Sequence, residues 1–275
     1  MENLKIGEVI GKRRRELGLT QNQLAQSLNI SFQAVSKWEN AVANPDIEML
    51  PRLAAALNTT VDGLLGYKSP EADYDRRYKA EDYYWGLLPN SICYDIMKIL
   101  PPVKPYRVLD IGCGEGKDAV FMAKCGYLVT AFDLSEQGID KAKRLAEHNK
   151  AEVNFFKADI FDYRPERAYD IIFSSGVIHI LPETMRKEFC DSLKSHTEDN
   201  GINVLNVFVQ KPFIAPAPDS TKEEDRYPWY SGELFGYYRD WLIHTCREDI
   251  FDCNSGGTPH KHCMDTMIAR KLKQS

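Results

Sequence analysis

The sequence predicts two structural classes in one chain, an all-α region followed by an α/β region with a mostly parallel sheet. Residues 1–66 contain several short helical patterns and no convincing strand. From Tyr106 onward, short β-branched runs alternate with longer amphipathic stretches, the pattern of strands connected by covering helices. We therefore expect an N-terminal helical domain at residues 1–66, a linker at 67–80 and an α/β domain at 81–275.

The individual elements of the α/β region can be placed from the same alternation. The expected strands are residues 106–110, 128–133, 153–157, 169–173 and 203–208, with the main helices at 117–124, 135–148 and 182–195.

Composition and charge narrow the class of protein. The hydrophobic content of 43% supports a buried core, and no run approaches the ~18 apolar residues of a membrane span. Seven cysteines without framework spacing, and a start without an apolar signal region, predict a cytoplasmic protein with reduced thiols. A net charge of −5 argues against a chain that coats nucleic acid or a membrane with its whole surface.

Two short helices joined by a tight turn are expected between residues 20 and 40. Thr20 and Gln23 have the spacing of a capping box, and Ser31 precedes a second helix at 32–40. The apolar stripes of the two helices are Leu24, Ala25 and Leu28, and Ala34, Val35 and Trp38. This pattern predicts a helix-turn-helix with 32–40 as its recognition helix.

Residues 6–66 resemble the Cro/phage-repressor (XRE-type) helix-turn-helix domain, notably through Leu-Thr-Gln at 19–21 and Val-Ser-Lys-Trp-Glu-Asn at 35–40. The resemblance implies that the second helix enters the major groove of DNA. The residues implied in DNA contact are Gln21 at a phosphate and Gln33, Ser36, Lys37 and Asn40 on the outward face of the recognition helix.

Charge sets a condition on this DNA binding. Residues 1–66 hold seven basic and seven acidic side chains, and only the cluster at 12–15 offers concentrated positive charge. Because DNA affinity comes largely from phosphate neutralisation, we expect weak binding by a monomer and specific binding by a homodimer on a two-fold site. A helical bundle kept for protein contact is the alternative.

A glycine-rich turn at residues 112–116 follows the first expected strand and enters a helix. Glycine is needed where the backbone turns with positive φ and approaches a ligand closely. A dinucleotide site requires a third glycine at position 117, which here is Lys117. Asp110 precedes the turn, where a carboxylate would repel a pyrophosphate and attract the ammonium and sulfonium groups of S-adenosylmethionine.

Acidic residues also follow the next two strands. Asp133, beside Leu134, is placed to accept both hydroxyls of a ribose, and Asp159 is placed to reach the adenine amino group, with Ile160 against the ring. The residues expected to bind S-adenosylmethionine are Asp110, Gly112, Cys113, Gly114, Asp133, Leu134, Asp159, Ile160 and Ser174.

These motifs resemble the class I S-adenosylmethionine-dependent methyltransferases over residues 74–272. The resemblance implies a Rossmann-like fold, a seven-stranded and mostly parallel sheet whose last strand is antiparallel, with a closing hairpin in 253–270. It also implies that residues 174–179, after the fourth strand, border the methyl group. That stretch lacks the Asp-Pro-Pro-Tyr type of motif common in DNA amino methylases, which indicates a small-molecule acceptor.

A closer resemblance is to the bacterial tellurite-resistance methyltransferases. It rests on residues 126–133, on Ser-Gly-Glu-Leu at 231–234 with Tyr237, Tyr238 and Trp241, and on residues 265–271. It implies chalcogen oxyanions, thiols or other soft, small nucleophiles as acceptors. The chain departs from that family in a long insert at 213–229 and in a Cys/His-rich tail.

Two residues are candidates for catalysis. His179 is placed to act as a general base at the methyl group, or is an ordinary core histidine. Tyr230, in the aromatic cluster 227–230, is placed in a lid that desolvates the sulfonium, or the cluster anchors the insert. Tyr84 and Trp85 either cover the cofactor or pack.

The tail contains Cys246, Cys253, His260, His262 and Cys263. Soft ligands of this kind bind zinc, but the spacing is not that of a standard zinc site. We therefore expect that these residues bind no metal and instead form part of the hairpin or of the substrate pocket.

For the whole chain, the sequence predicts a methyltransferase for a small molecule fused to a DNA-binding transcriptional regulator. The alternative is a regulator that uses the fold as a ligand sensor without turnover.

Overall fold

The computed structural model describes residues 6–57, 59, 61–65, 71–215, 227–253 and 259–273. The chain forms two compact units, Met1–Ala72 and Asp73–Ser275. Within the described residues, no helix has both the length and the apolar character needed to cross a membrane.

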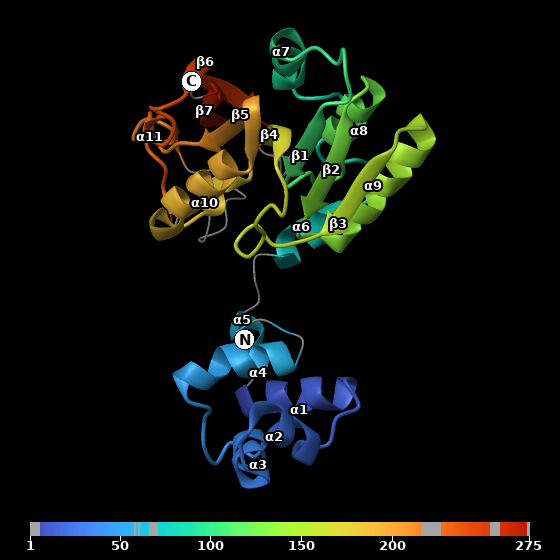
Figure 1. Cartoon of the computed structure of the whole chain (residues 1–275), viewed down its shortest axis with the longest axis vertical. Helices are drawn as coiled ribbons and strands as arrows, with labels where there is room; N and C mark the ends of the chain where they lie inside the picture. The colour runs from blue at the N-terminus through green and yellow to red at the C-terminus, as the bar shows by residue number, and fades with distance from the viewer. Residues whose placement is uncertain are drawn as a thin grey trace. The chain divides into compact units, whose positions relative to one another are not determined.

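In the described part of the first unit, the regular elements are all helices, as expected. Its elements are α1 (Ile6–Glu16), α2 (Gln21–Leu28), α3 (Phe32–Glu39), η1 (Ile47–Met49), α4 (Leu50–Ala56) and α5 (Val61–Leu64) (Figure 1). The predicted capping box is present, because Thr20 accepts from Gln23 N and the Gln23 side chain accepts from Thr20 N. Asn29 closes α2 in the left-handed conformation, and Ser31 caps α3.

One core holds these helices together. Leu24, Leu28 and Val35 are at most 1% exposed and pack with Ile10 and Leu53 from the flanking helices. Burying several such side chains, each worth about 1.5–3 kcal/mol, offsets the weak intrinsic stability of helices this short.

The boundary between the units falls within α6 (Glu71–Tyr78), and the second unit continues with α7 (Ser91–Ile99) and then alternates strands with helices. Its strands are β1 (Arg107–Ile111), β2 (Leu128–Asp133), β3 (Val153–Lys157), β4 (Tyr169–Ser174), β5 (Thr197–Phe208), β6 (Leu242–Cys253) and β7 (His260–Arg270). The remaining helices are α8 (Lys117–Lys124), α9 (Glu136–Asn149), η2 (Ile178–Ile180), α10 (Glu183–Ser195) and α11 (Glu233–Gly236).

The seven strands form one sheet in the order β3-β2-β1-β4-β5-β7-β6. The first five are parallel, and β7 runs antiparallel to both β5 and β6, so the expected seven-stranded sheet with an antiparallel last strand is confirmed. The predicted closing hairpin is formed by β6 and β7. The residues expected at its turn, 254–257, lie outside the described part of the chain.

Each face of the sheet carries its own core, because alternate residues of a strand point to opposite faces. Val108 and Phe173 pack with α7 and α8 on one face, whereas Leu109 and Ile172 pack with α10 and α11 on the other. Two strands differ from the prediction. β5 begins at Thr197 rather than at residue 203, and β6 was not predicted as a separate strand.

Candidate functional site

The glycine turn joins β1 to α8 in a conformation that requires glycine. Gly112, Gly114 and Gly116 have φ of 71°, 53° and 84°. A Cβ on Gly112 would lie 2.4 Å from a methyl of Val177, and one on Gly116 would lie 2.6 Å from the Cβ of Ala142. The turn is therefore both strained for other residues and tightly packed.

Asp110 sits directly before this turn, 2% exposed. Burial raises its pKa well above the usual range, and the nearby carboxylates of Asp118 and Asp133 raise it further. Its Oδ2 makes no hydrogen bond among the described residues. A buried carboxylate oxygen of this kind fits a ligand that carries a positively charged group, as the sequence predicted for S-adenosylmethionine. The neighbouring Cys113 thiol also has its pKa raised by burial.

Asp133 ends β2, next to β1 in the sheet. Its Oδ2 accepts from Gly114 N at 2.8 Å and its Oδ1 from Ser135 N at 2.9 Å. Burial raises its pKa, whereas these backbone N–H groups lower it. Leu134 is half-buried beside it. The carboxylate of Asp133 thus fixes the glycine turn. It lies at the same edge of the sheet as Asp110, at the carboxyl ends of β1 and β2.

The third predicted acid follows β3, the next strand in the sheet. Asp159 is half-buried, and its Oδ1 accepts from Phe161 N at 2.9 Å. Ile160 is buried at 5% exposure. Lys157, the last residue of β3, pairs in register with Asp133. Because β1, β2 and β3 are parallel neighbours, the acids at or just after their carboxyl ends lie along one edge of the sheet.

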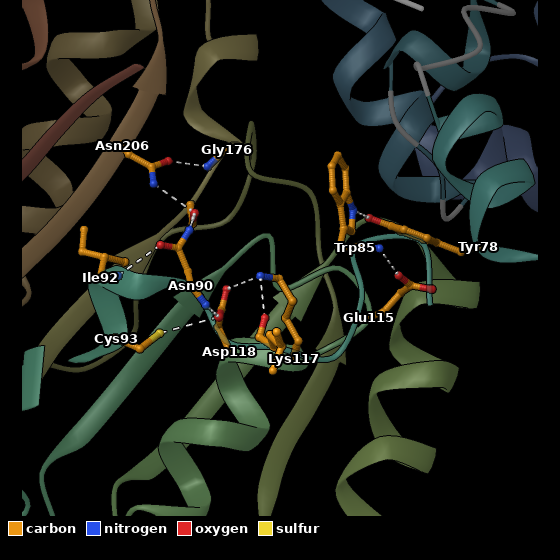
Figure 2. A network of polar contacts seen from close by, with 12 residues as sticks. Tyr78, Trp85, Asn90, Ile92, Cys93, Glu115, Lys117, Asp118, Gly176 and Asn206 are labelled. Atoms are coloured by element: carbon orange, nitrogen blue, oxygen red, sulfur yellow. Dashed lines mark hydrogen bonds and ion pairs between the residues drawn. The ribbon is translucent and has the colours of Figure 1, made fainter. Parts of the chain in front are cut away.

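The segment ahead of the first strand packs against the glycine turn. From the sequence, Tyr84 and Trp85 in this segment could either cover the cofactor or pack. Trp85 N donates to Glu115 Oε2 at 3.2 Å, and its indole N–H donates to Tyr78 Oη at 2.9 Å (Figure 2). A Cβ on Gly114 would lie 2.9 Å from that Tyr78 oxygen. Tyr84 stacks edge-on against Trp85. Two aromatic side chains thus form a wall at the turn.

A buried ion pair anchors this segment. Lys141 of α9 lies 2.5 Å from Glu115, and its ammonium also donates to the carbonyls of Ala80 and Asp82 at 2.9 and 2.6 Å. Sequence reasoning missed the pair. Its signal was a lysine within the apolar stripe of α9, beside Ala142.

A polar network holds the loop that follows β4 (Figure 2). Asn90 and Asn206 both donate to Ser175 Oγ at 3.0 Å, and Asn206 accepts from Gly176 N at 2.6 Å. Asn90 N also donates to Asp118 at 2.6 Å. The loop expected to border the methyl group is therefore fixed from two directions by side chains that sequence reasoning did not identify.

Two predicted residues frame that loop. The buried hydroxyl of Ser174 donates to the carbonyl of Ile111 at 3.1 Å and so joins β4 to the end of β1. His179 is 8% exposed, and its Nδ1 has no hydrogen-bond partner among the described residues. Burial, with a smaller effect of His262, lowers its pKa to about 4. The imidazole is therefore neutral at neutral pH, and its ring packs against Phe208 with centroids 5.0 Å apart.

Two members of the aromatic cluster 227–230 differ in burial. Trp229 is 1% exposed and anchors the segment, with the Arg186 guanidinium 4.2 Å from its ring centre. Arg186 also pairs with Glu233 at 2.7 Å. Tyr230 is 63% exposed, and its backbone N–H donates to Glu233 Oε2 at 3.3 Å. Arg186 lies on the apolar stripe of α10, which was its signal in the sequence.

In the helical unit, α3 presents the residues expected to meet DNA. Gln33, Lys37 and Asn40 are exposed and Ser36 is half-buried. The Asn40 amide donates to the carbonyl of Ser36 at 2.8 Å.

Gln21, expected at a phosphate, has a partner within the unit. Its amide donates to Glu39 at 2.9 Å, and Glu39 also receives a two-pronged pair from Arg14 at 2.6 and 2.9 Å. Glu39 therefore ties α1, α2 and α3 together beside the predicted DNA face.

Comparison with known proteins adds two family matches. Residues 77–260 match the model of "Tellurite resistance protein TehB", and residues 10–64 match a helix-turn-helix model. A Haemophilus influenzae protein named "Probable S-adenosyl-L-methionine-dependent methyltransferase TehB" is 25% identical over 221 residues, covering 78% of this chain and 72% of its own length.

Solved structures support the fold. The crystal structure of TehB from Haemophilus influenzae superposes with a TM-score of 0.58 at 24% identity, covering 73% of this chain and 66% of its own. A Burkholderia thailandensis 1,6-didemethyltoxoflavin-N1-methyltransferase with bound S-adenosylhomocysteine gives a TM-score of 0.55 at 18% identity, covering 74% and 88%.

These findings confirm the predicted class, a helix-turn-helix region joined to a class I methyltransferase that uses S-adenosylmethionine. The TehB model covers well over half of the chain. The chain therefore belongs to the family of the tellurite resistance protein TehB.

Proposed function

We propose that the second unit transfers the methyl group of S-adenosylmethionine to a small, soft nucleophile such as a chalcogen oxyanion or a thiol. The observation that carries this proposal is that Asp110 and Asp133 lie in the last two residues of β1 and β2, and His179 in the segment after β4, at the carboxyl ends of parallel strands. The tellurite-resistance family supports an acceptor of this class.

The acidic side chains would hold the donor. Asp110, with its unpaired Oδ2, would meet the positively charged part of S-adenosylmethionine, and Asp133 would accept the ribose hydroxyls. Gly112, Cys113 and Gly114 would let the backbone approach the ligand, while Leu134, Ile160 and Asp159 would surround the adenine. Ser174 would keep the end of β4 against β1.

The acceptor would lie beside the loop after β4. S-adenosylmethionine supplies an electrophilic methyl group for an in-line displacement, so the chain has to position the nucleophile and exclude water. Asn90 and Asn206 fix the loop for this purpose, and His179 would receive a proton from an acceptor that must lose one. Tyr230 would close over the site from its exposed position.

Incubation of the full chain with methyl-labelled S-adenosylmethionine and a panel of tellurite, selenite, thiols and small amines tests this proposal. We expect labelled product with at least one soft acceptor and slower transfer by His179→Ala. Binding of the donor without product from any member of the panel would instead favour a sensor without turnover.

We further propose that the first unit binds specific DNA as a homodimer and makes the protein a transcriptional regulator. The exposed Gln33 and Lys37 of α3, with Ser36 and Asn40, would read base edges. Gln21 would reach a phosphate only after exchanging its hydrogen bond to Glu39, so its contribution would be smaller than that of Lys37.

Selection of an operator from random DNA, followed by titration at fixed salt, tests this second proposal. We expect Gln33→Ala and Lys37→Ala to weaken operator binding by about 1–3 kcal/mol each. The exposed Gln26→Ala, on α2, serves as the control. Equal affinity of the wild type for operator and random DNA would contradict it.

A further inference from the structure

The hairpin of β6 and β7 gathers three soft side chains that no step of the proposed methyl transfer uses. Cys253 and His260 are directly opposite each other in the register, and His262 follows two residues later on the same strand. Residues two apart on a strand share a face, and so do residues paired across strands. The sulfur of Cys253 and a ring nitrogen of each histidine lie within 4.8 Å of one another.

We propose that Cys253, His260 and His262 form a binding site for a thiophilic divalent metal ion of the zinc class. This proposal departs from the expectation of no metal, which rested on the spacing of all five tail residues. Cys246 and Cys263 do not belong to the group. Cys263 neighbours His262 on the strand and so points to the opposite face, where it is 2% exposed.

The two imidazoles already have nearly the separation that an ion would require. His260 Nε2 and His262 Nε2 are 2.9 Å apart. Bonds of ~2.0–2.1 Å to a tetrahedral ion place two nitrogens about 3.3 Å apart. A shift of a few tenths of an ångström would therefore exchange this hydrogen bond for two metal bonds, with the ring proton moving to Nδ1.

The third ligand supplies charge and selectivity. On binding, the thiol of Cys253 loses its proton to solvent and bonds to the ion as a thiolate, and no oxidant or reductant is needed. A set of one thiolate and two imidazoles favours zinc-like ions over magnesium or calcium. The charged neighbours Lys261 and Asp252 pair with each other at 2.6 Å on the other face of the hairpin.

The position of the cluster connects it with the methyl-transfer edge. The His262 ring packs on Phe208, at the carboxyl end of β5, with centroids 4.7 Å apart, and His179 packs on the same phenylalanine at 5.0 Å. Phe251 packs against His262 at 5.8 Å. Three ligands are one fewer than structural zinc sites use, so the ion would keep a position for water or an external ligand at this edge.

Titration of the reduced, chelator-treated full chain with Zn²⁺, in competition with a chromophoric chelator, tests the proposal. We expect one tightly bound ion per chain. We expect Zn²⁺ binding to weaken on the order of 100-fold or more in each of the variants Cys253→Ser, His260→Ala and His262→Ala. Loss of a residue that only hydrogen-bonds a metal ligand costs up to about 100-fold, and loss of a ligand itself should cost at least as much. Cys246→Ser and His244→Ala, matched substitutions at exposed positions of β6, should leave Zn²⁺ affinity unchanged.

Cobalt substitution gives a second readout that does not depend on activity. Co²⁺ bound to the wild type should show a thiolate-to-metal absorption band that persists in Cys246→Ser and disappears in Cys253→Ser. Far-ultraviolet circular dichroism of the metal-free variants confirms that they fold. Wild-type affinity for Zn²⁺ no higher than that of a folded Cys253→Ser variant would overturn the proposal.

Discussion

Lys141 Nζ lies 2.5 Å from Glu115 Oε1, and the two side chains are only 4% and 2% exposed. The pair links α9, the glycine turn and the segment ahead of β1, because Lys141 also binds the carbonyls of Ala80 and Asp82. A charge pair this deep stabilises the fold only while both partners are present.

Lys141→Met should lower the free energy of unfolding by about 3–5 kcal/mol, because it leaves the Glu115 carboxylate buried and unpaired. Urea unfolding followed by tryptophan fluorescence measures this loss. The double variant with Glu115→Gln should recover much of it. Lys143→Met, at an exposed position of the same helix, is the control, and an equal loss in that variant would show that the pair is not responsible.

Binding of the methyl donor should release a proton from Asp110. Burial raises the pKa of this carboxyl in the free protein, and a bound cation would lower it again. Affinity for S-adenosylmethionine should therefore rise with pH until the pH exceeds the raised pKa of free Asp110. Calorimetry in two buffers of different ionisation enthalpy counts the released protons. Unchanged proton release in Asp110→Asn would assign it to another group.

Asp265 should make the second unit less stable as the pH rises. Burial, followed by the effect of Glu248, raises its pKa to about 6 from 3.8, although it accepts from Gly232 N at 2.7 Å. A raised carboxyl pKa favours folding while the group is protonated, and this advantage is lost between pH ~4 and ~6.

Asp265→Asn should consequently be about 1–3 kcal/mol more stable than the wild type at pH 7.5 and nearly equal to it at pH 4. Thermal or urea unfolding at both pH values measures the difference. A constant offset between the two proteins at all pH values would mean that Asp265 does not titrate in this range.

The fold was predictable where the signal is local. Short runs of apolar and β-branched residues mark β2 and β3 in the sequence, and both strands have the bounds expected from it. β6 gave no such signal, because it is an edge strand with mostly exposed, polar residues. β5 begins at Thr197 with a polar run, where the pairing with β4 shifts in register, and no apolar pattern marks such an extension.

The candidate site divides in the same way. The glycine turn and its acids follow one another along the chain, so their spacing predicted them. Asn90 and Asn206 reach Ser175 from 85 and 31 residues away, and a lone asparagine carries no mark of such a distant partner. The Cys/His group also depended on the structure, because the register of β6 and β7 decides which members share a face.

The central claim is that the edge formed by β1 and β2 binds S-adenosylmethionine, with Asp133 holding the ribose. Calorimetric titration of S-adenosylhomocysteine into the wild type and Asp133→Ala tests it most directly, with Asp140→Ala, at an exposed position of α9, as the control. We expect Asp133→Ala to lose ~2 kcal/mol or more of binding free energy, since hydrogen bonds to a charged group are worth about 1.5–3 kcal/mol, and Asp140→Ala to lose none. Equal affinities in all three proteins would contradict the placement of the cofactor.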